Sequence, residues 1–115
     1  MKPLSLPVIH ILLALADGSR HGYAIKQAVE ERTGGAIRLG PGTLYGAIRR
    51  LLEYGYIREV ESRVDPGVDD ARRRYYRLMP SGRAAAIAEA ERLAGLVKLA
   101  QARQIIPARA RGGRS

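Results

Sequence analysis

"GPGTLYGAIRRLLEYGYI", residues 40–57, has the spacing of a helix with two unlike sides. At about 100° per residue, Leu44, Ile48, Leu51 and Leu52 fall on one arc, at the i, i+4, i+7 and i+8 positions of a core-facing stripe. The opposite arc carries residues that a core does not select, namely Gly42, Thr43, Gly46, Arg49, Arg50 and Glu53. The sequence therefore predicts a helix over residues 42–54 that seals a core with one side and presents glycines and arginines on the other.

The remainder of the chain is divided by glycine, proline and apolar periodicity. We expect helices at about residues 7–16 and 21–33, the second ended by Gly34-Gly35. Alternation of apolar and polar residues predicts a short strand at 36–39 and a hairpin of strands at 56–63 and 72–78. From residue 80 to about 104 the only breaker is Gly95, which predicts a long fourth helix.

This order of elements predicts a mainly α fold with a small β-hairpin, a winged helix-turn-helix with a long C-terminal helix. We expect residues 1–79 to form the DNA-binding domain, residues 80–104 a dimerisation helix and residues 105–115 a basic, flexible tail.

The composition indicates a globular chain with an anionic partner. The formal net charge is +9, and most of the 20 basic residues are arginine, whose guanidinium binds phosphates and base edges bidentately. A GC-rich genome would also raise the arginine content, but it does not explain the net charge. No cysteine is present, which fits a cytoplasmic location. The apolar stretch at 8–16 is about half as long as a membrane span needs, so we expect no membrane segment.

The polar arc of residues 42–54 has the properties of a recognition helix in the major groove. Small residues such as Gly46 allow the helix backbone to approach the DNA, and Arg49 and Arg50 reach guanine edges or phosphates. Thr43 and Tyr45 can place hydroxyl groups on the backbone. The alternative for any single pair of arginines is a solvated helix face, but the position in the third helix of a basic chain favours DNA.

A second basic cluster follows at Arg72, Arg73 and Arg74, on the edge of the predicted hairpin. We expect Arg73 and Arg74 to contact the DNA backbone or the minor groove, as the wing of such a domain does. For Arg72 the sequence leaves two alternatives open, because this side chain could instead balance Asp65, Asp69 and Asp70 in the same loop.

Three stretches resemble the PadR family of bacterial transcriptional regulators: "HGYAIKQAVEERTGG", "GPGTLYGAIRRLLEYGYI" and "RRRYYRLMPSGRAA". The resemblance covers about residues 4–100. It implies a homodimeric, ligand-responsive repressor that binds an inverted-repeat operator in double-stranded DNA. Two positions depart from the family pattern. Gly46 stands where proline is usual after GTLY, and Met79 replaces a threonine before the fourth helix.

The resemblance also implies that the C-terminal helix dimerises together with the first helix. The residues agree, because small and apolar side chains follow a 4-3-4-3 spacing along the fourth helix. The predicted dimer interface comprises Leu12, Leu15, Ala86, Ala90, Leu93, Val97 and Ala100. The alternative is that the fourth helix packs only within its own chain.

Catalytic and metal sites are not predicted. His10 and His21 are the only histidines, and we expect the first in a core or interface and the second as a helix cap. No catalytic constellation and no cofactor can be named, so we expect no enzyme. Because the chain has neither Trp nor Phe, any effector would be a small apolar compound in an aliphatic pocket, lined by residues such as Leu12, Leu15, Leu93 or Val97.

Two other functions fit the same pattern. Winged helices also dock proteins, and a charge of +9 would suit an acidic protein partner. Non-specific nucleic-acid binding is the other alternative, because basic residues such as Lys98, Arg103 and Arg109 follow Glu91 without any acidic residue.

Overall fold

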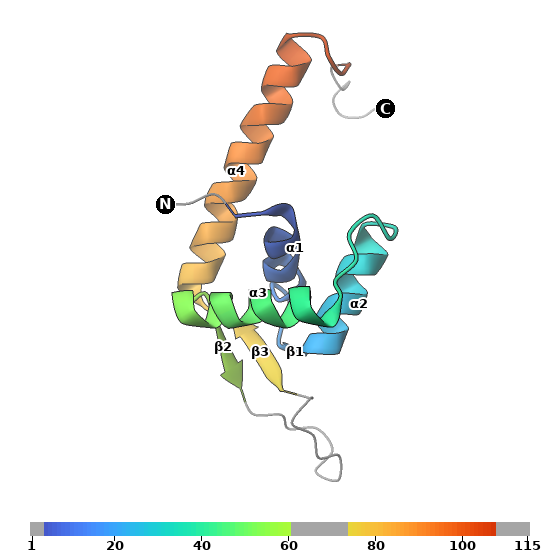
Figure 1. Cartoon of the computed structure of the whole chain (residues 1–115). Helices are drawn as coiled ribbons and strands as arrows, with labels where there is room; N and C mark the ends of the chain where they lie inside the picture. Colours follow the sequence, from blue (N-terminus) through green and yellow to red (C-terminus); the bar gives the residue numbers. More distant parts are fainter. Residues whose placement is uncertain (1–3, 61–73, 108–115) are drawn as a thin grey trace.

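The computed structural model describes residues 4–60 and 74–107 (Figure 1). Three helices, α1 (Leu6–Ala14), α2 (Gly22–Arg32) and α3 (Pro41–Tyr54), form the first half of the fold, and the long helix α4 (Pro80–Ala102) forms its C-terminal part. The order of helices and strands confirms the predicted fold class. The predicted wing tip lies outside the described residues.

A three-stranded antiparallel sheet lies below α3 in the view of Figure 1. It consists of β1 (Arg20–His21), β2 (Ile57–Val60) and β3 (Tyr75–Leu78), in the order β1-β3-β2. The strand predicted at residues 36–39 is wrong, since the described structure has no strand there. The third strand is β1 instead, whose Arg20 lies opposite Tyr76 in the register.

The core lies where α1, α2 and α3 meet the inner face of the sheet. The arc of α3 that was predicted to face inward does so, with Leu44, Ile48 and Leu51 at 1–2% exposure. The other large residues of the core are Ile11, Leu12, Leu15, Ile25, Val29, Leu39, Ile57 and Tyr76. Apart from one tyrosine the core is aliphatic, as the shortage of aromatic residues predicts.

Glycines end α2 and α3 as predicted. Gly34 and Gly55 have φ values of 61° and 79°, in the left-handed region that a side chain disfavours. After each of them an amide reaches back five residues, from Gly35 to the Glu30 carbonyl at 2.9 Å and from Tyr56 to the Leu51 carbonyl at 3.0 Å. This hydrogen bond is that of a Schellman motif, which stops the helix sharply.

The prediction that Leu12 and Leu15 of α1 contact a second subunit is wrong. They are 0% and 2% exposed, inside the core of their own chain. Helix α1 is apolar on nearly every side, so its sequence could not show which stripe the chain would cover. The stripe that remains on the surface is Leu6, His10 and Leu13, spaced i, i+4 and i+7.

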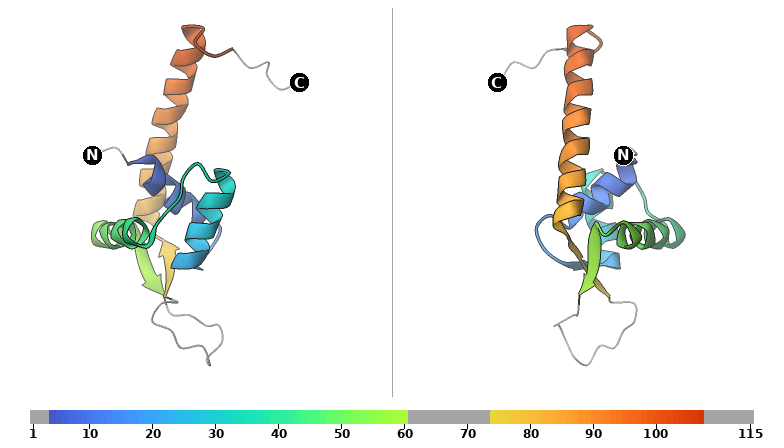
Figure 2. Two further views of the ribbon diagram at one scale, coloured as in Figure 1. Left: turned by 45° about the vertical axis from the view of Figure 1, so that its right-hand side comes forward. Right: turned by 90° about the vertical axis from the view of Figure 1, so that its left-hand side faces the viewer.

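Helix α4 changes environment along its length. Gly82, Ala85, Ala86 and Glu89 in its first turns are buried against the rest of the chain. Ala86, predicted as an interface residue, is only 9% exposed within one chain and packs against the chain's own core. The later turns extend away from the other elements (Figure 2), and Val97 there is 49% exposed.

The start of α4 shows the consequence of having methionine at position 79. Met79 is the N-cap residue, and no side chain caps the first turn. Ser81, which the sequence offers as a possible cap, donates its hydroxyl hydrogen to the Gly55 carbonyl at 2.8 Å instead. The junction is held by tertiary contacts rather than by local capping, since the Met79 amide also donates to the Tyr56 carbonyl at 2.9 Å.

Glu89 is a nearly buried carboxylate on α4, with a side chain that is 8% exposed. Its Oε2 accepts a hydrogen bond from Arg92 Nε at 2.6 Å. This bond, helped by the Leu4 amide and opposed by burial, holds the pKa of Glu89 below its ordinary value. A carboxyl with a lowered folded pKa stabilises the fold above its unfolded pKa, and this stability is lost as the pH falls through the folded value.

As the pH is lowered from about 6 to about 3, we therefore expect the free energy of unfolding to fall less in Glu89→Gln than in the parent chain. Urea unfolding at several pH values measures this difference. Glu91→Gln is the matched control, because it removes the same charge from an exposed side chain of the same helix. An unchanged acid dependence in Glu89→Gln would show that the Arg92 contact does not stabilise the fold.

Candidate nucleic-acid interface

The outer side of α3 is a two-glycine, two-arginine surface. Gly42, Thr43, Arg49 and Arg50 are exposed, and Gly46 is partly exposed. Neither arginine forms an ion pair or a hydrogen bond with any residue in the described part of the chain, so both guanidinium groups are available to a partner. In Figure 1, α3 lies across the front of the molecule, free of other elements on this side.

The N-terminus of α3 is open as well. Gly40 is the N-cap residue and offers no side-chain cap, and Pro41 occupies the first helical turn. The amide groups of this turn point out of the helix, and the helix dipole favours an anion at this end. Thr43 places its hydroxyl in the same turn, so the arrangement suits a phosphate oxygen beside the start of the helix.

Tyr45 is held on the flank of α3 by a glycine of α2. Its side chain is 40% exposed, and a Cβ atom built on Gly22 would lie 2.6 Å from the Tyr45 hydroxyl oxygen. The ring therefore packs against the backbone of Gly22, where an added side chain would have to displace it, and Gly22 is a positioning residue that sequence reasoning missed. The signal was present in the HGY and GTLY stretches, but nothing in one sequence shows that they touch.

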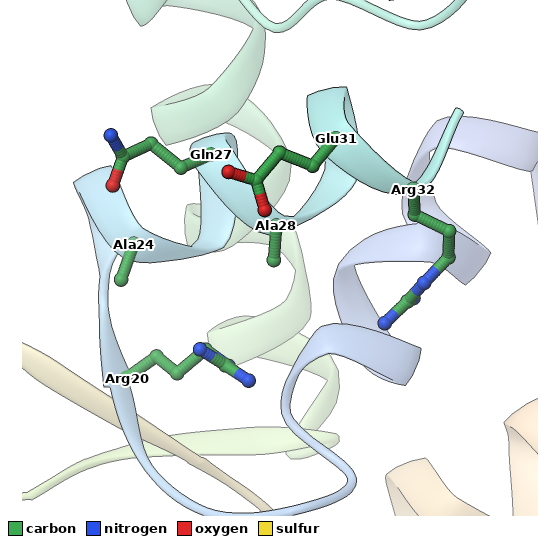
Figure 3. Close-up of a pocket in the computed structure, with 6 residues that line it drawn as sticks. All are labelled: Arg20, Ala24, Gln27, Ala28, Glu31 and Arg32. Carbon is green, nitrogen blue, oxygen red and sulfur yellow. The ribbon is translucent and has the colours of Figure 1, made fainter. Parts of the chain in front are cut away.

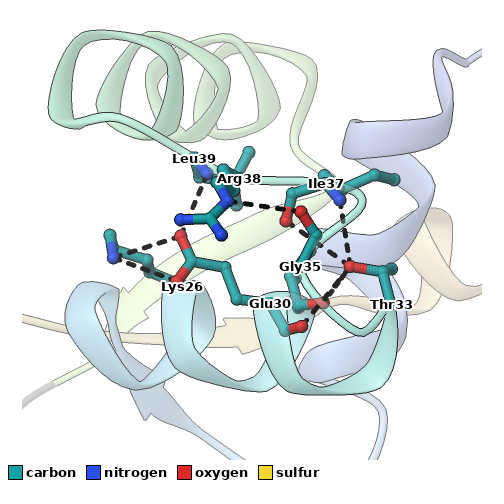
Figure 4. Close-up of polar contacts among 8 residues, drawn as sticks. Lys26, Glu30, Thr33, Gly35, Ile37, Arg38 and Leu39 are labelled. Atoms are coloured by element: carbon teal, nitrogen blue, oxygen red, sulfur yellow. Dashed lines mark hydrogen bonds and ion pairs between the residues drawn. The ribbon is translucent and has the colours of Figure 1, made fainter.

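Side-chain hydrogen bonds fix the loop between α2 and α3 (Figure 4). The Leu39 amide donates to Glu30 Oε2 at 3.3 Å, and the Ile37 amide donates to Thr33 Oγ1 at 3.1 Å. Lys26 pairs with Glu30 at 3.1 Å. These bonds occupy amides that a strand would use, which explains why residues 36–39 form none, and they set the angle at which α3 leaves α2.

His21 caps α2, as expected. Its Nδ1 accepts a hydrogen bond from the Ala24 amide at 3.1 Å, and its ring packs edge-on against Tyr75 with centroids 5.4 Å apart. The start of α2 is thereby attached to β3. His10 lies on the surface stripe of α1, and its Nδ1 is buried without a hydrogen-bond partner in the described structure.

The predicted wing arginines are only partly covered by the described residues. Arg73 lies outside them. Arg74 is exposed and pairs with Glu59 at 3.6 Å, on the side of the sheet that faces α3. The opposite side carries Arg58 and Arg77, exposed and directly across from each other in the register. Sequence reasoning did not assign these two, although strand alternation already turned Arg77 outward.

Two arginines form hydrogen bonds that serve the fold. Arg20 Nε donates to the Ala14 carbonyl at 2.6 Å, and Arg83 Nη2 donates to the Ala16 carbonyl at 3.3 Å. Both cap carbonyl groups at the C-terminal end of α1, where positive charge is favourable. The arginine surplus of the chain therefore has a structural part that composition alone does not reveal.

Metal-binding clusters and membrane-spanning helices are not found among residues 4–60 and 74–107. These residues contain no cluster of three or more metal-ligating side chains. No helix within these ranges is long and apolar enough to cross a membrane. Of the residues expected to line an aliphatic effector pocket, Leu12 and Leu15 are inside the core, whereas Val97 is exposed.

Gly46 allows the surface of α3 to be tested with one methyl group. A Cβ atom there would meet only Arg50 Nη1, at 3.9 Å. We expect Gly46→Ala to stabilise the fold by about 0.5–1 kcal/mol, because alanine is the better helix former. We also expect it to weaken operator binding about tenfold, because the methyl group keeps DNA from the backbone. Thermal unfolding and fluorescence anisotropy measure the two effects, and unchanged affinity would contradict close backbone approach.

The first three helices, of which the third is two-sided, and the antiparallel sheet define the chain as a winged-helix protein. The chain belongs to the transcriptional regulator PadR-like family, whose model matches residues 11–88. The members of this family are regulators of transcription and not enzymes.

Two curated relatives are similar to this chain. The transcriptional regulator Rv3488 of Mycobacterium tuberculosis (strain ATCC 25618 / H37Rv) is 40% identical over 77 residues, which are 67% of this chain and 65% of that protein. An uncharacterised 37.1 kDa protein in transposon TN4556 of Streptomyces fradiae is 44% identical over 86 residues, which are 75% of this chain and 22% of that protein. The chain spans less than two thirds of the length of either relative.

Solved structures share the fold. A transcriptional regulator from Clostridium thermocellum superposes with a TM-score of 0.69 at 28% identity, over 81% of this chain and 84% of its own. PadR of Bacillus subtilis in complex with operator DNA has a TM-score of 0.63 at 21% identity, over 73% of this chain and 46% of its own. The second similarity supports the fold alone.

Proposed function

We propose that this protein is a sequence-specific DNA-binding regulator of transcription, a ligand-responsive repressor that binds an inverted-repeat operator as a homodimer. The observation that carries the proposal is the outer arc of α3, where Arg49 and Arg50 are exposed beside two glycines and have no acidic partner in the described chain. Such a surface fits a groove between two phosphate backbones. With DNA as the partner, we place the protein in the cytoplasm.

The side chains on this arc divide into two roles. Arg49 and Arg50 both lie about two helical turns beyond Thr43, where a guanidinium can pair bidentately with the O6 and N7 atoms of guanine. Thr43, Tyr45 and the open amides of the first turn contact phosphates and set the register of the helix in the groove. Arg73 and Arg74 extend the backbone contact along the wing, and Gly46 permits close approach.

The homodimer is supported by the apolar surface that one chain leaves uncovered. The stripe of α4 that is buried at Ala85 and Glu89 continues into Leu93, Leu96, Val97 and Ala100, beyond the reach of the chain's own core. A second copy supplies the missing cover, with Ala90 at the edge of the contact, and the α1 stripe of Leu6, His10 and Leu13 adjoins it. Two-fold symmetry then presents two copies of α3 to two half-sites.

The proposal divides the chain by task. Residues 1–79 read the DNA, residues 80–104 join two subunits, and residues 105–115 form a basic tail. A role in transcription is supported by the relative Rv3488, which is called a transcriptional regulator.

The test of DNA binding is fluorescence anisotropy with a duplex from the region upstream of the protein's own gene, against a scrambled duplex of equal length. We expect tighter binding to the upstream duplex, and a steep loss of affinity with salt because bound arginines release counterions. Equal affinity for both duplexes would indicate non-specific binding. Binding to neither at moderate salt would favour a protein-interaction module.

The dimer is tested by placing a charge on the exposed stripe of α4. Val97 is 49% exposed in one chain, so we expect Val97→Glu to fold and to sediment as a monomer, because an unpaired carboxylate cannot be buried at the contact. Ala88→Glu is the matched control, since Ala88 is exposed on the opposite side of the same helix. A Val97→Glu chain that remains dimeric would contradict the proposed interface.

A further inference from the structure

A hollow of about 520 Å³ lies beside α2, and no residue of α3 lines it (Figure 3). Its lining comes from β1 and from one side of α2. The six residues are Arg20, Ala24, Gln27, Ala28, Glu31 and Arg32. The proposed contacts to DNA and to a second subunit use none of these residues.

The shape of the hollow follows from the helix. Ala24, Gln27, Ala28 and Glu31 are spaced i, i+3, i+4 and i+7, so they lie on one face of α2. The two alanines are small and leave an apolar floor, while the longer Gln27 and Glu31 stand at its rim (Figure 3). A small molecule with a short apolar body fits this floor.

The charge in the hollow comes from two arginines. The guanidinium groups of Arg20 and Arg32 point toward one another across it (Figure 3). Arg20 is held by the 2.6 Å hydrogen bond from its Nε to the Ala14 carbonyl, which leaves its two terminal nitrogens to face the hollow. Within the described part of the chain, neither Arg20 nor Arg32 forms an ion pair.

We propose that this hollow binds a small oxyanion, a carboxylate or a phosphate group, between Arg20 and Arg32. Paired guanidinium groups are suited to such anions because their donors match two oxygens at once. Gln27 adds an amide donor at the rim. Glu31 has a negative charge, so it weakens the binding of every anion here, and that of a doubly charged anion more than that of a singly charged one.

The position of the hollow links such a ligand to regulation, and this part of the inference rests on the proposed function. Arg20 is bonded to the end of α1, whereas Arg32 stands in the last turn of α2, just before the loop that leads to α3. An anion that binds both arginines therefore connects the end of α1 to the end of α2, from which the loop leads to α3. Its binding therefore favours one spacing of these helices over another.

Binding is tested without DNA, so that it stands apart from the proposed function. Butyrate and inorganic phosphate are titrated into the full chain, and amide chemical shifts are followed by NMR. We expect shifts at Arg20, Ala24 and Arg32, with affinity about tenfold weaker in Arg32→Gln and higher in Glu31→Gln. Arg103→Gln, an exposed arginine elsewhere, is the matched control. No localised shifts, or an equal loss in Arg103→Gln, would overturn the site.

A second experiment decides whether the hollow binds a free small anion or a phosphate of the DNA backbone. Operator affinity is measured in phosphate-free buffer, with and without butyrate, for the parent chain and Arg32→Gln. If butyrate changes the operator affinity of the parent chain but not that of Arg32→Gln, the regulatory role is supported. If butyrate binds and the operator affinity of the parent chain does not change, the regulatory role is overturned, while the anion site itself stands. Weakened operator binding by Arg32→Gln, with no response to either free anion, would assign the hollow to DNA and overturn the small-molecule proposal.

Discussion

Gly82→Ala is expected to remove a large share of the stability of the fold. Gly82 is buried where α4 begins, and a Cβ atom there would clash with the backbone carbonyl of Tyr56 and stand 3.0 Å from Leu78 Cδ1. A backbone carbonyl that joins α3 to β2 cannot move aside as a flexible side chain can. We expect a loss of about 3 kcal/mol, from a total of about 5–15 kcal/mol for a domain.

The matched control is the same substitution at Gly95, further along α4. Gly95 lies in α4 with nothing within 4 Å of the position of its missing Cβ atom. We expect Gly95→Ala to stabilise the chain by about 0.5–1 kcal/mol, since only helix propensity changes there. Urea unfolding of both variants should therefore give opposite signs. Equal effects at the two positions would mean that the close contact at Gly82 does not exist.

The fold was predictable from the sequence wherever one helix or strand carried its own signal. The two arcs of α3 follow from the 3.6-residue period, and the ends of α2 and α3 follow from Gly34 and Gly55. Strand β1 was not predictable, because two residues cannot show alternation. The strand expected at 36–39 failed for a related reason, since its alternation competes with hydrogen bonds to Thr33 and Glu30 that only the folded loop reveals.

Predicting the candidate site was limited by contacts between distant segments. The exposure of Arg49 and Arg50 agrees with the helical period, but the support of Tyr45 by Gly22 needs two helices to be brought together. For α1 the helical period does not show which side faces the core, because apolar residues cover most of the circumference of this helix. Leu12 and Leu15 were therefore assigned to a partner, although their own chain covers them.

Arginine chemistry was equally ambiguous in the sequence. Arg20 and Arg83 have the same side chain as Arg49, yet they bind carbonyl groups at the end of α1. The carbonyl that Arg20 binds is six residues away in the sequence, and the one that Arg83 binds is 67 residues away. Only the contact of Arg83 therefore depends on the complete fold. Net charge predicts an anionic partner for the protein as a whole, but it does not say which arginines meet it.

Arg49→Ala and Arg50→Ala are each expected to weaken operator binding by about 1–3 kcal/mol if the side chain pairs bidentately with guanine. Both side chains are exposed and have no partner in the described chain, so we expect the fold to keep its stability. Arg49→Lys separates charge from geometry, because lysine retains the charge and loses the fork. Affinities for the upstream and scrambled duplexes, measured at several salt concentrations, give both the loss and its cause.

The pattern of losses assigns each arginine to a role. A residue that reads a base should lose affinity for the upstream duplex far more than for the scrambled one. A residue on a phosphate should weaken both alike and lower the salt slope by about one. Arg103→Ala removes the same charge at the exposed end of α4 and controls for net charge. If Arg49→Ala and Arg50→Ala bind the operator as tightly as Arg103→Ala does, the outer arc of α3 is not the recognition surface.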